Sequence, residues 1–403
     1  MSSHVTILAA GTRGDVQPYV ALALGLLDAG HDVTLAANAE FEAFARAYGV
    51  PFSPLRADYL TLADTPEGRA ALKGNPLTAS RRMRKLAAPM IRRMLDDAWV
   101  AAQDTDAIVH HPKSLAGPHL SERLGVPAYA ACAVPMLTPT RAFPVPGLVK
   151  AASLGPALNH ASYRLAAAAA RTYKGTVASW REETLDLPHA PHGPRPTTIT
   201  LYAYSEAVLP RPSDWRADTI VTGYWFLPPA PSWKPDPELQ RFLGTGAPPV
   251  YVGFGSMPTE PGTGAQVVAA LRRAGVRGLI AGMDIAPADD MLAVKDVPHE
   301  WLFERVAVTV HHGGAGTVGA GLRAGKPAVI VPQGVDQPFW ARAVHTTGAA
   351  PKPVDDLTHL ADAITAATRL TPCAADLGRL LRREHSTHVA VAQLGGAAAR
   401  LAA

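Results

Sequence analysis

The stretch 306–340, VAVTVHHGGAGTVGAGLRAGKPAVIVPQGVDQPFW, limits most strongly what this chain can fold into. It contains two apolar runs rich in valine, 306–310 and 327–331, which are too short for stable helices and typical of buried parallel strands. A glycine-rich turn and a short helical segment lie between them. The stretch therefore predicts a strand–helix–strand crossover, and with it an α/β fold.

The turn after the first of these strands has the composition of an anion-binding site. A helix start leaves unpaired backbone N–H groups and a positive dipole end, and glycines let a bulky anion approach them. A histidine at the end of the strand can donate a hydrogen bond to a phosphate oxygen. The alternative is a glycine-rich turn with a structural role only. The pattern matches neither a Walker P-loop nor the G-x-G-x-x-G dinucleotide motif. The predicted phosphate site comprises His311, Gly313, Gly314, Ala315, Gly316 and Thr317.

The chain has 403 residues, so two domains of roughly 200 residues each are expected. A strand–helix–strand pattern opens twice, at 5–37 and at 249–281, with the first helix expected at 18–29. We expect the first sheet to be completed by strands near 107–109, 128–130 and 198–202. The many prolines of 205–240 predict a segment without regular structure. We expect an N-terminal domain at 1–215, a linker at 216–240, a C-terminal domain at 241–385, and a helix at 386–403 that packs back on the N-terminal domain.

Charge and cysteine usage narrow the classes of function. The formal net charge of +4 and the pI near 9.1 suit an anionic small molecule or an acidic surface, but they fall short of a nucleic-acid-binding protein. The two cysteines, Cys132 and Cys373, form no C-x-x-C pair, which predicts neither a disulfide framework nor a zinc site. We see no leader peptide and no apolar run of membrane-spanning length, so a cytoplasmic protein is expected.

The suggestive motifs all fall at one kind of position. Open α/β sheets bind ligands beyond the carboxyl ends of their strands. If two such sheets face each other, the loops after residues 10, 109, 254, 310 and 331 line a single cleft.

Three motifs together resemble the GT-B glycosyltransferases of the sterol glucosyltransferase and antibiotic (glycopeptide, polyketide) glycosyltransferase type. They are GTRGDVQPYVALALGL near the start, YVGFGSMP in the middle, and VPHEWLF followed by the 311–340 motif. The resemblance covers both predicted domains and implies two Rossmann-like domains that face each other across a cleft. It also implies an inverting transfer of a sugar from a nucleotide diphosphate donor, held by the C-terminal domain, to an acceptor hydroxyl held by the N-terminal domain. Neither a metal nor a cofactor is expected, because the nucleotide sugar is a co-substrate.

Asp15, in the G-T-R-G-D turn, is the candidate general base that the resemblance implies. A hydroxyl that attacks the anomeric carbon must lose its proton as the oxocarbenium-like state forms, and a carboxylate on the opposite face can accept it. The alternative is that Asp15 only caps the following helix. Plant-type relatives use a histidine of this loop with a supporting aspartate. No histidine lies between Gly11 and Tyr19, so Asp15 is expected to act without that dyad.

Asp336 and Gln337 match the D-Q pair that hydrogen-bonds sugar hydroxyls in this family, and we expect the sugar to be glucose. The alternative is that Asp336 only forms a turn ahead of Pro338. Plant-type motifs place a ribose-binding glutamate where Gly319 stands here, and Trp301 is expected to pack rather than to stack on a base. The choice between UDP and TDP therefore stays open. Further donor-binding candidates are Thr12, Ser256, Val297 and His299.

The acceptor side is less defined. Residues 76–99 predict a helix whose methionine-rich stripe is ringed by arginines. That stripe fits burial in the domain, contact with an anionic membrane, or an opening onto an apolar acceptor. The acceptor-binding candidates are Met83, Met90, His110, His111, Met136 and Phe143.

The sequence thus predicts a monomeric or homodimeric hexosyltransferase that uses a UDP- or TDP-sugar. Its acceptor would be a hydrophobic hydroxylated small molecule such as a polyketide, terpenoid, sterol or lipid, which suggests natural-product tailoring. Two alternatives remain: a UDP-sugar 2-epimerase of the same fold, and a catalytically silent helper homologue. The G-T-R-G-D turn and the D-Q pair favour the transferase, since neither alternative requires both.

Overall fold

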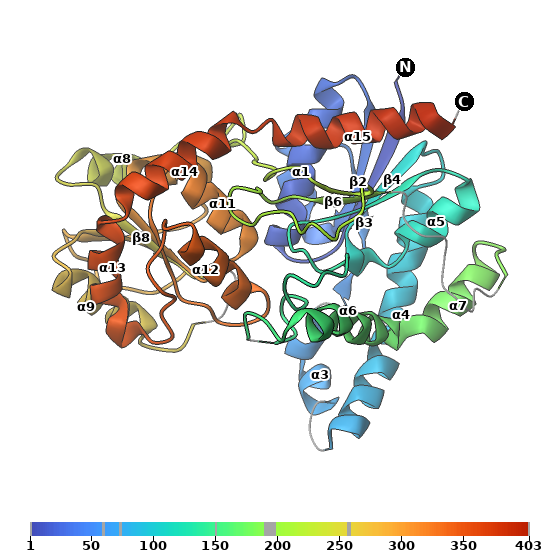
Figure 1. Cartoon of the computed structure of the whole chain (residues 1–403), viewed down its shortest axis with the longest axis horizontal. Helices are drawn as coiled ribbons and strands as arrows, with labels where there is room; N and C mark the ends of the chain where they lie inside the picture. The colour runs from blue at the N-terminus through green and yellow to red at the C-terminus, as the bar shows by residue number, and fades with distance from the viewer. Residues whose placement is uncertain are drawn as a thin grey trace.

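The computed structural model describes residues 2–58, 61–71, 75–149, 151–188, 199–255 and 259–401. Within these ranges the chain forms two α/β domains side by side, each built on one parallel sheet (Figure 1). This confirms the predicted fold class. No helix of the described ranges is long and apolar enough to cross a bilayer.

The N-terminal sheet has seven described strands, and every pairing between them is parallel. In spatial order they are β3 (Phe52–Leu55), β2 (Asp32–Asn38), β1 (His4–Ala9), β4 (Ala107–His110), β5 (Ala128–Cys132), β6 (Ile199–Tyr202) and β7 (Thr219–Val221). The helices of this domain are α1 (Arg13–Asp28), α2 (Glu42–Arg46), α3 (Pro66–Ala71), α4 (Pro76–Ala101), α5 (Gly117–Leu124), α6 (Pro156–Ala170) and α7 (Lys174–Glu183).

Side chains of β1 show how this sheet is covered on both faces. Ile7 belongs to the core formed with α1, whereas Leu8 belongs to the core formed with α4 and α5, and neither is exposed. Successive side chains of a strand point to opposite faces, so an uninterrupted apolar run is what a sheet between two helical layers requires. Each such side chain contributes roughly 1.5–3 kcal/mol by leaving water.

The C-terminal sheet has five described strands, again all parallel. Their order is β10 (Met291–Val294), β9 (Gly278–Ala281), β8 (Val250–Gly253), β11 (Val308–His311) and β12 (Ala328–Ile330). The helices are α8 (Pro237–Gly244), α9 (Thr263–Arg273), α10 (His299–Leu302), α11 (Ala315–Arg323), α12 (Gln337–Thr346), α13 (Leu360–Thr368) and α14 (Thr371–Arg383).

The last helix, α15 (Ser386–Leu401), returns from the C-terminal to the N-terminal domain and lies along α1 (Figure 1). Ala390 and Leu394 are buried in the core of the N-terminal domain. The Tyr129 hydroxyl donates a hydrogen bond to the Leu394 carbonyl, at 3.4 Å. The two domains are therefore joined at a second place besides the segment that follows β7.

Two local expectations need correction. The segment 205–240, expected to lack regular structure, contains β7, which forms one edge of the N-terminal sheet, and the start of α8. An edge strand of three residues carries too short an apolar pattern to be recognised among prolines. In addition, α1 begins at Arg13 rather than at residue 18, and Pro18 lies inside the helix. Strands β3 and β10 are additions to the predicted sheets.

Candidate active site

Both sheets have a point where the strand order reverses, and the predicted site residues gather there. In the N-terminal sheet the chain moves from β1 outward to β3 and then returns to β4 on the other side of β1. In the C-terminal sheet β11 likewise lies beside β8, after β9 and β10 have extended the other side. The loops at the carboxyl ends of such neighbouring strands diverge and leave a crevice, which is where open α/β sheets bind ligands.

Asp15 lies in the first turn of α1, directly after β1. Its Oδ2 accepts hydrogen bonds from the backbone N–H of Thr12, at 2.8 Å, and from the Thr12 hydroxyl, at 3.2 Å. Gly11 has a φ of +148°, and a Cβ there would overlap with the Asp15 carboxylate. The capping role considered for Asp15 is therefore present, and it fixes the direction of the carboxylate.

The loop after β4 brings two more polar side chains to this carboxylate. Lys113 Nζ lies 2.7 Å from Asp15 Oδ2, and His111 Nε2 lies 3.4 Å from Asp15 Oδ1. The backbone N–H of Lys113 donates to His111 Nδ1, at 3.2 Å. Since Nδ1 is the acceptor in the neutral ring, the proton of His111 sits on Nε2 and points at Asp15. Asp15 thus has a histidine partner after all, supplied by a different strand.

Burial lowers the pKa of His111 to about 4, with Asp15 acting in the opposite direction, so the ring is neutral at pH 7. Burial also acts to raise the pKa of Asp15, but His111, Lys113 and the hydrogen bond from Thr12 outweigh it, and the net pKa is lowered. Asp15 is consequently ionised at neutral pH and can accept a proton.

His311 ends β11 and is completely buried. Its Nδ1 accepts a hydrogen bond from the Gly313 N–H, at 3.1 Å, whereas its Nε2 is buried without a partner. Burial lowers the pKa of His311 well below its ordinary value, so the ring is neutral and Nε2 carries the proton. A buried donor without a partner is costly, and a phosphate oxygen of a bound ligand would satisfy it.

Helix α11 starts immediately after this strand, with Gly314 as its N-cap and Ala315, Gly316 and Thr317 in its first turn. Gly313 has a φ of +95°, and a Cβ there would lie 2.8 Å from Ile330. A side chain at Gly314 would lie 2.6 Å from the His312 ring. The predicted phosphate residues therefore surround the free N–H groups of one helix start.

Asp336 and Gln337 begin α12, after the loop that follows β12. The Gln337 Oε1 accepts from the backbone N–H groups of Gln333, at 2.7 Å, and Gly334, at 3.1 Å, so the side chain holds this loop. Burial raises the pKa of Asp336, with Asp15 acting in the same direction and Lys113 in the opposite one. Asp336 therefore lies within electrostatic reach of the Asp15 cluster in the other domain.

The two domains are in direct contact around these loops. Arg13 and Asp296 form an ion pair of 3.6 Å between the first residue of α1 and the loop before α10. Phe143 and Phe339 pack edge to face with ring centroids 5.1 Å apart. One buried core contains side chains of both domains, among them Phe143 and Trp340. The carboxylate of one domain and the helix start of the other thus face a common boundary.

The structure accounts for Gly319, where plant-type motifs carry a ribose-binding glutamate. A Cβ at Gly319 would lie 2.7 Å from the ring of Tyr224, which belongs to the segment after β7. No side chain fits there without displacing this buried aromatic ring. Ribose contacts at this position would have to come from other groups.

Several predicted residues have other surroundings. The His299 ring stacks on Phe303 with ring centroids 4.4 Å apart, its Nε2 lies 3.2 Å from the Tyr251 hydroxyl, and the residue is half-buried. His110 is buried with its Nε2 unpartnered, and a Cβ at Gly117 would overlap with its ring, so the ring packs against the start of α5; its acceptor role stays a prediction.

Met83 and Met90 are half-buried in the core between α4 and the sheet, as the burial alternative predicted, and nothing places them at the boundary. Met136 is exposed on the loop after β5, and Val297 packs near β8 and α10. Trp301 packs on Trp233, as expected. Ser256 lies outside the described residues.

Lys113 is the residue that sequence reasoning missed. It follows the strand at the reversal point of the N-terminal sheet, two residues after His111, and this position was the available signal. Its partner Asp15 is 98 residues away in the sequence, so the contact itself was not visible.

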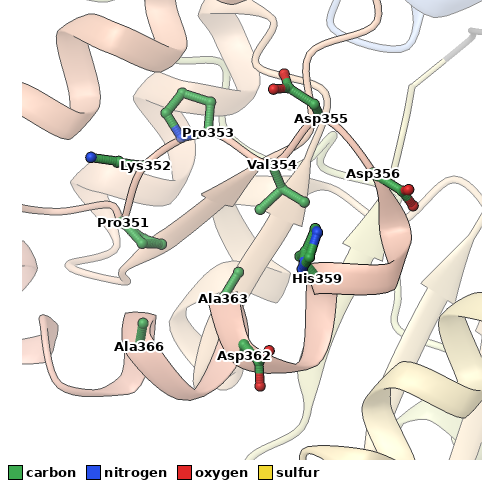
Figure 2. Close-up of a pocket in the computed structure, with 10 residues that line it drawn as sticks. All are labelled: Pro351, Lys352, Pro353, Val354, Asp355, Asp356, His359, Asp362, Ala363 and Ala366. Carbon is green, nitrogen blue, oxygen red and sulfur yellow. The ribbon is translucent and has the colours of Figure 1, made fainter.

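The described residues contain no group of three or more histidine, cysteine or acidic side chains placed to hold a metal ion. A surface hollow of about 510 Å³ lies on the C-terminal domain beside α13, lined among others by Asp355, Asp356 and His359 (Figure 2). It contains none of the predicted site residues. One of its carboxylates, Asp356, caps the following turn by accepting from the Thr358 N–H.

Comparison with known proteins agrees with this geometry. Residues 5–144 match the glycosyltransferase family 28 N-terminal domain, and residues 280–387 match the erythromycin biosynthesis protein CIII-like C-terminal domain. The chain is thus similar to glycosyltransferases, and its fold is that of the GT-B structures. The alignment to the first domain includes the Asp15 turn and His111, and the second includes the 311–340 motif.

The curated relatives of this GT-B protein include sterol 3-beta-glucosyltransferases. That of Neosartorya fischeri is 33% identical over 380 residues, covering 86% of this chain and 26% of the relative. That of Pichia angusta is 33% identical over 420 residues, covering 97% of this chain and 33% of the relative. The chain therefore spans only about a quarter to a third of the length of these relatives.

Solved structures with the same fold include other glycosyltransferases. The kitacinnamycin glycosyltransferase matches with a TM-score of 0.70 at 18% identity, and the match covers 98% of this chain and 98% of that protein. The calicheamicin glycosyltransferase CalG4 has a TM-score of 0.68 at 17% identity, with full coverage of both chains. The spinosyn rhamnosyltransferase SpnG in complex with thymidine diphosphate has a TM-score of 0.65 at 17% identity, covering 98% of this chain and 100% of SpnG.

Proposed function

We propose that this protein is an inverting, metal-independent glycosyltransferase that moves a hexose, glucose in the first instance, from a UDP- or TDP-sugar to a hydroxyl of a hydrophobic small molecule. The observation that carries the proposal is the placement of the ionised Asp15, with His111 and Lys113, opposite the start of α11 with its unpartnered His311 donor. A sugar between them would have a base on one side and a diphosphate site on the other.

Each side of this arrangement supplies one half of the reaction. Asp15 would accept the proton of the acceptor hydroxyl as its oxygen bonds to the anomeric carbon. The bond to the diphosphate breaks on the opposite side of that carbon, which inverts its configuration. His311 Nε2–H and the free N–H groups of α11 would stabilise the charge on the departing diphosphate, a role that preorganised donors fill without a metal.

Lys113 occupies Oδ2 of Asp15, so an acceptor hydroxyl would either displace Lys113 from this oxygen or donate its proton to Oδ1. Asp336 is a carboxylate of the opposing domain whose pKa responds to both Asp15 and Lys113, and it is the candidate for binding sugar hydroxyls. The Gln337 side chain would contribute through its amide N–H groups, since its oxygen already holds the loop.

The relatives support the substrate classes. Sterol 3-beta-glucosyltransferases at 33% identity support glucose and a hydrophobic acceptor, whereas the thymidine diphosphate complexes of proteins with this fold support a TDP-sugar. The two described cysteines are free thiols, which suits a cytoplasmic protein. The 2-epimerase and the silent helper are not favoured, because neither explains a carboxylate held against the acceptor side.

The test is incubation of the purified full chain with UDP- and TDP-sugars and a panel of sterols, terpenoids and polyketides, read by mass spectrometry. The expected result is an acceptor whose mass increases by one hexose residue, with release of the nucleoside diphosphate. Conversion of the donor into an epimer, or release of the diphosphate without any glycosylated acceptor across the panel, would contradict the proposal.

A further inference from the structure

The outer face of α6 is an apolar stripe that no part of the described chain covers. Leu158 and Leu165 are each 61% exposed, and Ala161 and Ala168 are exposed between and beyond them. These positions recur every three or four residues, so they form one line along the helix. The opposite face carries the buried Tyr163 and holds the helix on the domain. Exposed leucines aligned along one helix indicate an interaction surface.

The chain segments that form this stripe and the neighbouring part of α4 are basic, although Asp214 of another segment lies within electrostatic reach of His160 on α6. No acidic residue occurs anywhere in 123–181, and none occurs in 68–95, the segment that includes the N-terminal half of α4. The cationic side chains exposed on these elements are Arg81, Arg82, Arg84, Lys85, Arg164, Arg171 and Lys174.

The end of α6 lies near α4 through the turn that follows it. The turn η5 (Arg171–Tyr173) directly continues α6 and contacts α4. Arg84 of α4 is within electrostatic reach of Tyr173. Figure 1 shows α6 beside α4 on the side of the N-terminal domain where α3 and the start of α4 project. We call the exposed side chains of α6, η5 and residues 78–86 the α4–α6 surface.

We propose that the α4–α6 surface docks the protein on an anionic lipid bilayer. Leucines along a helix that lies in the interface plane enter the headgroup region, while surrounding arginines and lysines bind anionic headgroups. A second copy of the chain is a poorer occupant, because a symmetric dimer would place the same basic surface against itself. Nucleic acid would leave the leucine stripe exposed.

The docking surface is connected to the predicted acceptor loop by the buried face of α6. The Ser162 hydroxyl accepts a hydrogen bond from the Val145 N–H, at 2.8 Å, and the Asn159 side chain donates to the Arg141 carbonyl, at 3.0 Å. Phe143 lies on the same loop. Docking would therefore place this loop close to the membrane, where apolar acceptors dissolve. The docking itself does not depend on the transfer reaction.

The test is flotation of the purified full chain with vesicles of phosphatidylcholine, alone or mixed with phosphatidylglycerol. The protein should float with the mixed vesicles at low salt and much less with phosphatidylcholine alone. Because each cation near an anionic surface changes partitioning roughly fivefold, the variant R81Q/R82Q/R84Q should lower the partition coefficient by about 100-fold. The variant L158S/L165S should lower it by about tenfold or more.

Two control variants match these changes on the other domain. R241Q/K352Q/R369Q removes the same charge from exposed positions of the C-terminal domain, and L380S removes an exposed leucine of α14; both should float like the wild type. Thermal unfolding of every variant checks that the fold is retained. Absence of binding to mixed vesicles, or equal losses in the control and test variants, overturns the proposal. A wild-type dimer that L158S/L165S converts to a monomer in size-exclusion chromatography, without vesicle binding, would assign the stripe to a contact between copies.

Discussion

Replacement of Asp15 by asparagine separates the two roles that the structure gives this residue. The asparagine oxygen can still accept the hydrogen bond from the Thr12 N–H, so the cap of α1 is retained. The variant loses the charge that pairs with Lys113 and the ability to take up a proton. The expected result is a folded protein that binds the donor but hardly transfers the sugar.

The structure sets the magnitudes. The lost ion pair joins a Lys113 side chain that is 44% exposed to an Asp15 side chain that is 20% exposed, so it is worth only about 0–1 kcal/mol of stability. General base catalysis contributes typically 10²- to 10⁴-fold, which corresponds to about 3–5 kcal/mol of transition-state stabilisation. Asp15→Ala should be as inactive and should in addition lose about 0.5–2 kcal/mol of stability with the cap.

The assay is the rate of glycosylated product formation, combined with calorimetric titration of UDP and TDP and with urea unfolding. Asp28→Asn is the matched control, since it makes the same change at an exposed position of the same helix. Transfer by Asp15→Asn within a few-fold of the wild-type rate would refute the base assignment. An equal loss of donor affinity and of rate would assign Asp15 to binding instead.

The remaining predictions concern the donor site, the fold and the pH dependence. His311→Ala should weaken binding of UDP or TDP by about 10-fold or more, because a hydrogen bond to a charged group is worth about 1.5–3 kcal/mol. The control is His110→Ala, which removes a buried histidine of the other domain and should leave the dissociation constant of UDP or TDP unchanged. An unaltered dissociation constant for His311→Ala would contradict the phosphate role. Gly319→Ala should lose about 1–3 kcal/mol in urea unfolding by crowding the Tyr224 ring, whereas Gly316→Ala, where a Cβ meets open space, should lose none. Burial disfavours the charged forms of His110 and His299 and lowers both pKa values to about 4. In the unfolded chain a histidine has a pKa of about 6.5, so below that pH the unfolded chain binds more protons than the folded chain does. Stability should therefore fall as the pH drops from about 6.5 towards 4, by up to about 1.4 kcal/mol per pH unit for each histidine; unfolding midpoints that are equal at pH 7 and pH 5 would contradict this.

The strands of the two sheets show how much of the fold local sequence could predict. Strands such as β1 and β11 lie between two helical layers, so they must be apolar throughout, and this pattern is readable from a few residues. The edge strand β7 has a neighbour on one side only and lies among prolines, so its existence depends on the main chain of β6 rather than on its own composition. The start of α1 was misplaced because the capping contacts of Asp15 decided it, and not Pro18.

For the candidate site, the sequence by itself determined the chemical groups. Each predicted motif follows a buried strand, and the ends of parallel strands meet at one edge of a sheet, so local pattern alone assigns the turn at Asp15 and the glycines after His311 to a site. Only the tertiary structure decided their surroundings. Long-range contacts bring His111 and Lys113 to Asp15 and fill the space above Gly319 with Tyr224, while burial leaves Nε2 of His311 without a partner. The physical reason is that the pKa and the hydrogen-bonding capacity of a side chain depend on burial and on neighbours that are distant in sequence, and neither is encoded in a local motif.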